Sequence, residues 1–395
     1  MMVLAKKYGC VLDFGSSKIT AMIGEKGVNN TFNIHGTGET EYAGYYEGEF
    51  VEPEKLLASI ESTLTKAQTN SGLEITKLFV GVPSEFSFCK TKSAGISFKK
   101  RTKIGVDEIY SFFDLASKDL DVSNCTILNR SPIFFMLDDK RKCMDPKGQV
   151  TSKLYGEISF IFAENSFIEK INDILSQLGI SNVEYVSSPL AQSIYLLDPE
   201  IRDTGAILID CGYISTSVAL VKGDGLLGLN AFSLGGGHIT ADLSQVLQLS
   251  FKDAETLKRK VVLSLDASDN DFYEIVNGTG SVTPVSAKLT NEIVGARVDM
   301  IATMISRSLS ALKGSYNGYL PVYLTGGGIC YLKGGKDYLS KAIGSNIEIL
   351  SPQVPQLNRP HFSSVLGLLD LALAQVKTEK LSFGEKLKRL FKHKS

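Results

Sequence analysis

Residues 9–24, GCVLDFGSSKITAMIG, predict two β-strands joined by a short polar turn. An apolar run leads into Asp13, and the alternation typical of a half-buried strand resumes at Ile19. Glycine lets the backbone approach a ligand, so that N–H, hydroxyl and ammonium groups of the turn can contact phosphate oxygens. A carboxylate here can hold Mg²⁺ through water. The candidate residues are Asp13, Gly15, Ser16, Ser17 and Lys18. Alone, such a turn is more often an ordinary hairpin corner.

A similar turn recurs in residues 205–221, GAILIDCGYISTSVALV, where an apolar strand again leads into an aspartate, a glycine and two hydroxyl residues. The recurrence indicates a duplicated fold in which the two turns face each other. In residues 322–328, VYLTGGG, a short strand runs into three glycines, which would let the backbone lie close to a flat group. These two segments add the candidates Asp210, Gly212, Ser215, Thr216, Gly326, Gly327 and Gly328.

The composition is that of a soluble globular protein of two or three domains. The chain has 395 residues, 43% of them hydrophobic, and a net charge of −1, so no overall positive field would recruit nucleic acid. Six scattered cysteines without a C-x-x-C pair predict free thiols in a cytosolic protein. No secretory signal and no apolar run of membrane-spanning length is expected.

The pattern changes between the first strands and residue 162, and this region predicts a compact α+β insert. Residues 85–98 read as a β-meander, residues 106–120 as an amphipathic helix, and residues 126–137 and 154–162 as strands. The insert offers no defensible acid–base pair, so we expect a binding or assembly module. Further along, residues 263–277 are expected to be irregular and acidic.

The last fifteen residues, 381–395, LSFGEKLKRLFKHKS, carry four Lys and one Arg against one Glu, a net charge of +4. On a helix, Phe383, Leu387, Leu390 and Phe391 would share one narrow arc, and Lys388, Arg389 and Lys392 would lie opposite. This pattern is typical of a helix that lies in a membrane interface, with basic residues toward anionic headgroups. A solvated basic tail and a helix packed on the body are the alternatives.

Together these features resemble the bacterial cell-division family FtsA, within the superfamily of actin, Hsp70 and sugar kinases. The two Asp-x-Gly hairpins match the superfamily's phosphate loops, and LTGGG at residues 324–328 matches its adenosine motif. The insert, with NRSPIFF at residues 129–135 and the turn DPKG at residues 145–148, resembles the subdomain that FtsA carries in place of the second small lobe of actin. The match covers essentially the whole chain.

The resemblance implies an α/β, actin-like, two-lobed ATPase fold with an α+β (SHS2-type) insert and a C-terminal amphipathic helix. ATP and Mg²⁺ would lie in the cleft, with Asp13 and Asp210 holding the metal through water and the remaining residues of the two turns on the phosphates. Gly326, Gly327 and Gly328 would lie beside the nucleoside, and Glu255 and Lys258 on the ribose and adenine. Ser188 and Pro189 stand where related chaperones have Glu-Pro, so slow hydrolysis or none is expected.

The same resemblance divides the chain into subdomains. The expected boundaries are 1–76, 163–204 and 351–380 for subdomain 1A, 77–162 for the inserted subdomain 1C, 205–239 and 306–350 for subdomain 2A, 240–305 for subdomain 2B, and 381–395 for the membrane helix.

The implied function is to tie FtsZ filaments to the inner face of the cell membrane at the division site. The FtsZ C-terminal peptide would dock on residues 240–305, where Arg297 matches a basic residue of the family. Self-polymerisation, an anionic membrane surface and other division proteins are the further implied partners. Tyr213 and Ile214 depart from the superfamily, which mostly has glycines there, and Met300 stands where many FtsA sequences have an acid. A related pilus-assembly scaffold and a sugar-kinase-type phosphotransferase are the alternative functions.

Overall fold

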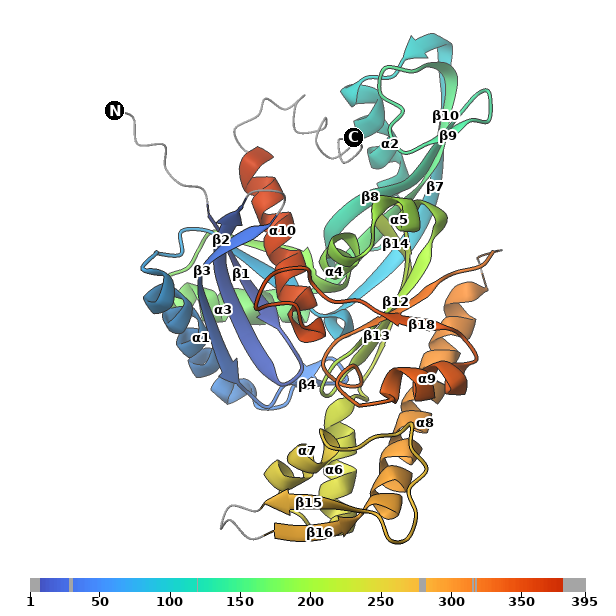
Figure 1. Cartoon of the computed structure of the whole chain (residues 1–395). Coiled ribbons are helices and arrows are strands. Elements are labelled where there is room, and N and C mark those ends of the chain that lie inside the picture. The colour runs from blue at the N-terminus through green and yellow to red at the C-terminus, as the bar shows by residue number, and fades with distance from the viewer. Residues whose placement is uncertain are drawn as a thin grey trace.

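Two five-stranded sheets of equivalent topology form the centres of two lobes (Figure 1). The computed structural model describes residues 8–27, 31–118, 120–276, 282–314, 316 and 318–378. In each sheet an antiparallel hairpin is extended by a third antiparallel strand on one side and by two parallel strands on the other. The first sheet has the order β11-β6-β1-β2-β3, made of Val183–Ser187, Leu78–Val82, Gly9–Phe14, Lys18–Lys26 and Phe32–Glu41. The second has the order β14-β13-β12-β17-β18, made of Gly225–Phe232, Thr216–Lys222, Ala206–Cys211, Val322–Thr325 and Ile347–Ile349. The predicted duplication is therefore confirmed.

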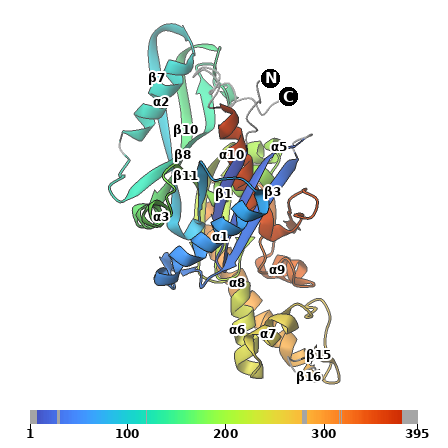
Figure 2. The same ribbon diagram turned by 90° about the vertical axis from the view of Figure 1, so that its left-hand side faces the viewer.

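Helices cover both faces of the first sheet (Figure 2). Side chains alternate between the two faces along each strand, so each face has apolar side chains that pack against helices. Leu12 on β1 packs in one buried cluster with residues of α1 (Leu56–Ser71) and α3 (Asn165–Gln177). Its neighbour Val11 packs on the opposite face against α10 (Ser363–Thr378). Helix α4 (Ser188–Leu196) lies beside α10 and leads through α5 (Pro199–Thr204) into the second sheet.

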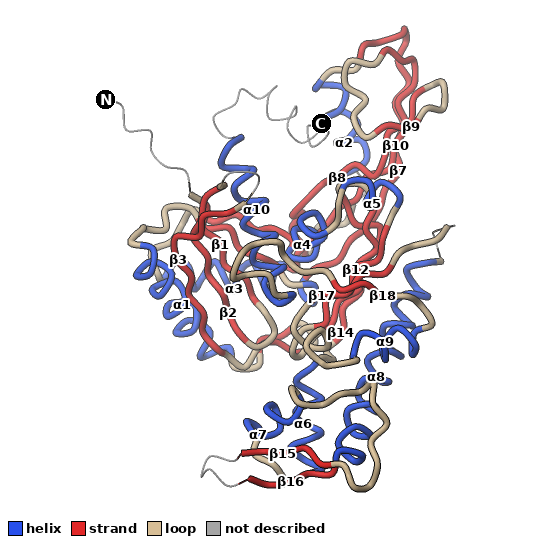
Figure 3. The backbone as a smooth tube through the Cα atoms, viewed as in Figure 1, coloured by secondary structure: helices blue, strands red, loops and turns tan. Residues whose placement is uncertain are grey.

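The insert is a four-stranded sheet with one helix, seen at the top of Figure 1 and as long strands in Figure 3. Its order is β7-β10-β8-β9, made of Ser87–Lys103, Val150–Glu164, Cys125–Leu137 and Lys142–Cys143, with α2 (Val106–Ser117) packed on one face. The expected meander over residues 85–98 is wrong. Strand β7 is continuous, and Gly95 pairs with Tyr155 of β10 instead of turning the chain.

The helical end of the second lobe is built from α6 (Gly236–Leu247), α7 (Phe251–Lys258) and the long α8 (Ala287–Lys313), with α9 (Gly335–Ile343) closer to the sheet. The expectation of irregular structure over residues 263–277 is wrong at its end, because β15 (Phe272–Val276) pairs with β16 (Val282–Ser286). Short elements β4 (Tyr45–Tyr46), β5 (Glu49–Phe50), η2 (Pro53–Lys55), η3 (Ser84–Phe86) and η4 (Pro360–Phe362) complete the described chain. None of its described helices is long and apolar enough to cross a membrane.

A buried serine joins the insert to the second lobe. The hydroxyl of Ser159 on β10 donates to the Leu226 carbonyl at 2.6 Å and accepts from the Leu226 N–H at 3.1 Å. Both residues are fully buried, so water cannot replace either hydrogen bond. This contact holds β14, the edge strand of the second sheet, against the insert.

Replacing Ser159 with alanine is expected to lower the free energy of unfolding by about 2 kcal/mol, because two backbone groups lose their partner inside the protein. Urea unfolding followed by circular dichroism measures the loss. Ser111→Ala, at an exposed position on α2, is the matched control and should change stability by less than about 0.5 kcal/mol. Equal effects of the two substitutions would contradict the assignment.

Candidate functional site

The two predicted turns meet across the boundary between the lobes. Each is closed by the same backbone hydrogen bond, from Gly15 N–H to Lys18 O at 3.0 Å in the first and from Gly212 N–H to Ser215 O at 2.8 Å in the second. The Ser16 hydroxyl oxygen accepts hydrogen bonds from the N–H groups of Tyr213 at 3.1 Å and Ile214 at 3.0 Å. The turns therefore not only face each other but are joined by one side chain.

Two carboxylates lie one residue before the ends of the strands that lead into these turns: Asp13 is buried and Asp210 is partly buried. The Ser364 hydroxyl donates to Asp13 Oδ1 at 2.8 Å, and the Gln192 amide donates to Asp210 Oδ2 at 2.9 Å. Burial raises the pKa of Asp13 to about 6, with a further contribution from the negative charge of Asp210. Burial raises the pKa of Asp210 as well. Burial thus disfavours the charged form of both carboxylates. A nearby cation would favour the charged form again and lower both pKa values.

Two carboxylates are enough for a metal ion that keeps most of its water ligands, but not for one coordinated by protein side chains alone. The described residues contain no group of three or more His, Cys, Asp and Glu side chains placed to hold a metal ion. Mg²⁺ commonly uses one or two carboxylates and completes its shell with water and phosphate oxygens. Asp13 and Asp210 therefore fit the role that the resemblance implies.

Sequence reasoning missed the residues that hold these two carboxylates in place. Ser188 at the start of α4 also donates to Asp13, at 3.4 Å, and the Gln192 amide donates to Ser363 at 2.8 Å as well as to Asp210. The partners lie 175 and 351 residues from Asp13 along the chain. The only sequence signal was the position of the three serines, Ser188, Ser363 and Ser364, in the first turns of helices α4 and α10.

The three consecutive glycines lie against the second turn. Gly326 has a φ of +89°, and a Cβ added to it would lie 2.2 Å from Asp210 Oδ1. A Cβ on Gly328 would lie 2.3 Å from the Gly212 carbonyl oxygen, and the Gly328 N–H donates to Cys211 O at 2.7 Å. The three glycines were predicted to let the backbone lie close to a flat group. In the structure their backbone lies close to the protein's own second turn. Gly327 faces Tyr331 and His361 instead.

Glu255 and Lys258 lie together on α7 and are tied to the N-terminus of α6. The Lys258 ammonium donates to Glu255 Oε2 at 2.6 Å, to the Thr240 hydroxyl at 2.8 Å and to Gly236 O at 3.0 Å. Burial lowers the pKa of Lys258, and hydrogen bonds from Lys258 and Thr240 help to lower the pKa of Glu255 although burial opposes them. All three ammonium donors are used within the protein.

The remaining side chains of the two turns have different surroundings. The Lys18 ammonium pairs with Glu39 at 2.9 Å on the surface. The Thr216 hydroxyl donates to Leu234 O at 2.6 Å and is buried, while Ser215 is buried near Tyr45 and Glu85. Ser17 contributes its carbonyl oxygen, which accepts from the Tyr42 N–H at 3.2 Å.

Arg297, the residue expected to bind a partner peptide, is already paired within the protein. Arg297 on α8 forms a two-point ion pair with Asp242 on α6, at 2.5 and 2.7 Å, and Met300 one turn later is 52% exposed. The expected membrane residues Phe383, Leu387, Lys388, Arg389, Leu390, Phe391 and Lys392 lie outside the described residues.

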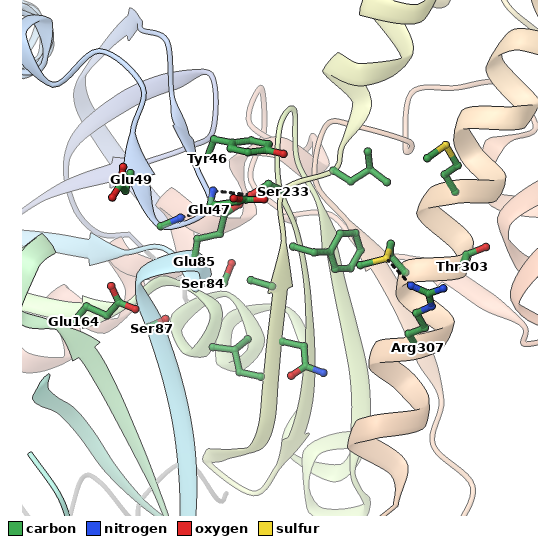
Figure 4. A pocket seen from close by; sticks show the side chains of 18 of the residues that line it. Tyr46, Glu47, Glu49, Ser84, Glu85, Ser87, Glu164, Ser233, Thr303 and Arg307 are labelled. Atoms are coloured by element: carbon green, nitrogen blue, oxygen red, sulfur yellow. Dashed lines mark hydrogen bonds between the residues drawn. The ribbon is translucent and has the colours of Figure 1, made fainter. Parts of the chain in front are cut away.

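A separate cavity of about 1000 Å³ lies between the first lobe and the β14–α8 side of the second. Glu85 and Ser233 lie on one wall and Arg307 on the opposite wall (Figure 4). Glu85 accepts from the Ser233 hydroxyl at 3.0 Å and from the Gly48 N–H at 3.3 Å, and burial raises its pKa. This cavity contains none of the residues of the two turns.

Comparison with known proteins agrees with this geometry. A sequence model of the family described as "Cell division protein FtsA" matches residues 207–367. The Cell division protein FtsA of Bacillus subtilis is 23% identical over 94% of this chain and 85% of its own length. That of Enterococcus hirae is 25% identical over 91% of this chain and 81% of its own length.

Solved structures share the fold. The "PilM-PilN type IV pilus biogenesis complex" aligns with a TM-score of 0.62 and 17% identity, over 92% of this chain and 98% of that one. MreB5 of Spiroplasma citri bound to AMPPNP aligns with a TM-score of 0.55 and 10% identity, over 95% of this chain and 98% of that one. The duplicated fold indicated by the two hairpins and the actin-like fold implied by the resemblance are confirmed, and the chain is similar in sequence to FtsA proteins over most of its length.

Proposed function

We propose that this protein binds ATP with Mg²⁺ between its lobes and ties a filament of the division protein FtsZ to the inner face of the cell membrane. The observation that carries the proposal is the pair of hydrogen-bonded turns, each preceded by a strand that carries an aspartate, in a chain similar in sequence to FtsA. Bound Mg²⁺-ATP would supply a cation for the two carboxylates and a polyphosphate for the backbone donors of the turns.

In this proposal the chain's own residues bind and orient the nucleotide. Asp13 and Asp210 would hold the metal through water, with Ser364 and Gln192 fixing the carboxylate orientation. Gly15, Ser16, Ser17, Lys18, Gly212, Ser215 and Thr216 are the proposed phosphate residues. Glu255, Lys258 and the glycines 326–328 would form the nucleoside end. We expect hydrolysis to be slow or absent, since Ser188 cannot act as a general base.

The adaptor role needs two further surfaces. We propose that residues 240–305, with Arg297, bind the FtsZ C-terminal peptide. We also propose that copies of the chain assemble into filaments and that other division proteins bind to them. Residues 381–395, with a net charge of +4, would bind anionic membrane as an interfacial helix. One copy would bind reversibly and a filament would bind firmly, because many weak contacts act together.

Removing residues 381–395 is expected to abolish sedimentation of the chain with vesicles that contain anionic lipid. The full chain should sediment with these vesicles, carry FtsZ with it, and remain in the supernatant with neutral vesicles. Equilibrium binding of a fluorescent ATP analogue, measured on the same two proteins, should be unchanged by the truncation and should require Mg²⁺.

The two halves of the proposal fail separately in this experiment. Equal sedimentation of the full and shortened chains would contradict the membrane assignment. Absence of ATP binding would contradict the nucleotide site, and ATP and membrane binding without FtsZ capture would instead favour the pilus-type scaffold.

A further inference from the structure

The aromatic ring of Tyr213 lies on the N-terminal turn of α6. A Cβ added to Gly237 would lie 2.7 Å from Tyr213 Cε1 and 2.9 Å from both Cδ1 and Cζ, so the ring packs directly on the bare backbone of this glycine. The Lys258 ammonium lies 5.6 Å from the ring centroid, within range of a cation–π interaction. Only a glycine at position 237 leaves room for the ring.

The backbone of Tyr213 is held from both lobes. Its N–H donates to the Ser16 hydroxyl at 3.1 Å, and its carbonyl oxygen accepts from the Gly237 N–H at 2.6 Å. The Gly236 N–H likewise donates to the Gly212 carbonyl oxygen at 3.0 Å. The first donors of α6, which could otherwise receive an anion, are thus used by the second turn.

The ring occupies the region that the proposed function gives to the nucleoside. Lys258 and Glu255, the residues proposed for the ribose and adenine, both act on the ring. Lys258 stands over it, and the charges of Glu255 and Glu41 add to burial in raising the pKa of Tyr213 to about 12. The phenol is therefore neutral at physiological pH. A nucleoside and this ring cannot occupy the same contacts.

We propose that Tyr213 is an internal plug of the nucleoside end of the site, and that a purine nucleoside triphosphate binds only after the ring leaves Gly237. The inference rests on the proposed function, because it concerns the same nucleotide site. When the competent conformation is a minor fraction of the population, the apparent affinity falls by that fraction. A ligand that lacks a nucleoside needs no such displacement.

Tyr213→Ala is therefore expected to bind Mg²⁺-ATP on the order of tenfold more tightly than the natural chain. This factor corresponds to a natural chain in which about one tenth of the molecules have the ring away from Gly237. Inorganic tripolyphosphate should bind both proteins equally. Tyr213→Phe should gain less affinity for ATP than Tyr213→Ala, because its ring still packs on Gly237 and only the hydrogen bond between the hydroxyl and Thr240 is lost. Tyr319→Ala, which removes a ring that is 83% exposed, is the matched control and should leave both affinities unchanged. Titration calorimetry with the full chain measures all four proteins.

The absence of tryptophan from the sequence allows a second readout that does not depend on the alanine variant. Tyr213→Trp introduces a single tryptophan at the plug position. Its emission should shift to the red when saturating Mg²⁺-ATP expels the ring into water, and should not shift with tripolyphosphate.

Each contrary result has a distinct meaning. Equal or weaker ATP binding by Tyr213→Ala, or an unchanged emission spectrum of Tyr213→Trp with ATP bound, overturns the plug and leaves the proposed nucleotide site standing. Failure of every variant to bind either ATP or tripolyphosphate overturns the plug together with the proposed function.

Discussion

Asp13→Asn is expected to raise the free energy of unfolding of the nucleotide-free protein by about 3 kcal/mol at pH 8. Asp13 is 8% exposed at the end of β1, and its pKa is raised to about 6, first by burial and then by the charge of Asp210. Above pH 6 the folded chain holds the charged Asp13 carboxylate in a buried position, which lowers its stability. Asparagine fills the same volume and carries no charge, and it can still accept the hydrogen bond from Ser364.

The pH dependence of this gain identifies its cause. A carboxyl whose pKa is higher in the folded than in the unfolded chain contributes stability that is present below the unfolded pKa and lost as the pH rises through the folded pKa. With an unfolded value of about 3.9, the natural chain loses this contribution between about pH 4 and pH 7. The difference between Asp13→Asn and the natural chain should therefore grow from about 0.5 kcal/mol at pH 4 to about 3 kcal/mol at pH 8.

Urea unfolding of the two proteins at pH 4, 6 and 8 tests this result. Asp114→Asn, at an exposed position on α2, is the control and should shift stability little at any pH. A difference that stays constant between pH 4 and pH 8 would show that the carboxyl of Asp13 does not titrate near pH 6. A gain at pH 8 would also show that the natural carboxylate lowers the stability of the nucleotide-free protein. The same buried charge is the group that would bind a cation, so the loss of stability is linked to the proposed function.

The hairpins could be predicted from the sequence because their signals are local. Alternating apolar residues, the aspartate at the strand end and the glycine two residues later all lie within six residues of each turn. Periodicity also predicted the helix α2 of the insert, but it did not distinguish a meander from the single long strand β7. Gly95 decides that question through its pairing with Tyr155, which is sixty residues away in sequence.

The surroundings of the candidate site could not be predicted in the same way. Ser364 contacts Asp13 from 351 residues away, and Gln192 reaches Asp210 only because α4 lies beside the second sheet. Tyr213 was visible as a departure from glycine, but the direction of its ring depends on the approach of α6 to the second turn. Residues that act through packing between distant segments leave no short-range pattern in the sequence.

Gly326→Ala is expected to lower the free energy of unfolding by more than about 3 kcal/mol, because two costs add at this position. The φ of +89° is unfavourable for any residue with a Cβ, and the new methyl group would lie 2.2 Å from Asp210 Oδ1 and 2.4 Å from the Cys211 carbonyl oxygen. The second contact is with backbone that the Gly328 N–H holds in place at 2.7 Å, so it cannot move away cheaply.

Gly344→Ala separates these two costs. Gly344 ends α9 with a φ of +66°, and a Cβ added there would meet nothing within 4 Å, so its substitution should cost only about 1 kcal/mol of backbone strain. Urea unfolding of both variants measures the difference, and equal losses would mean that β17 and the second turn are not packed as closely as the glycines indicate. Strand β17, which leads directly into Gly326, pairs in parallel with β12, which carries Asp210, from Ile207 opposite Val322 to Asp210 opposite Thr325. A displacement of the glycines would therefore also move the carboxylate, and we expect Gly326→Ala to weaken Mg²⁺-dependent nucleotide binding while Gly344→Ala leaves it unchanged.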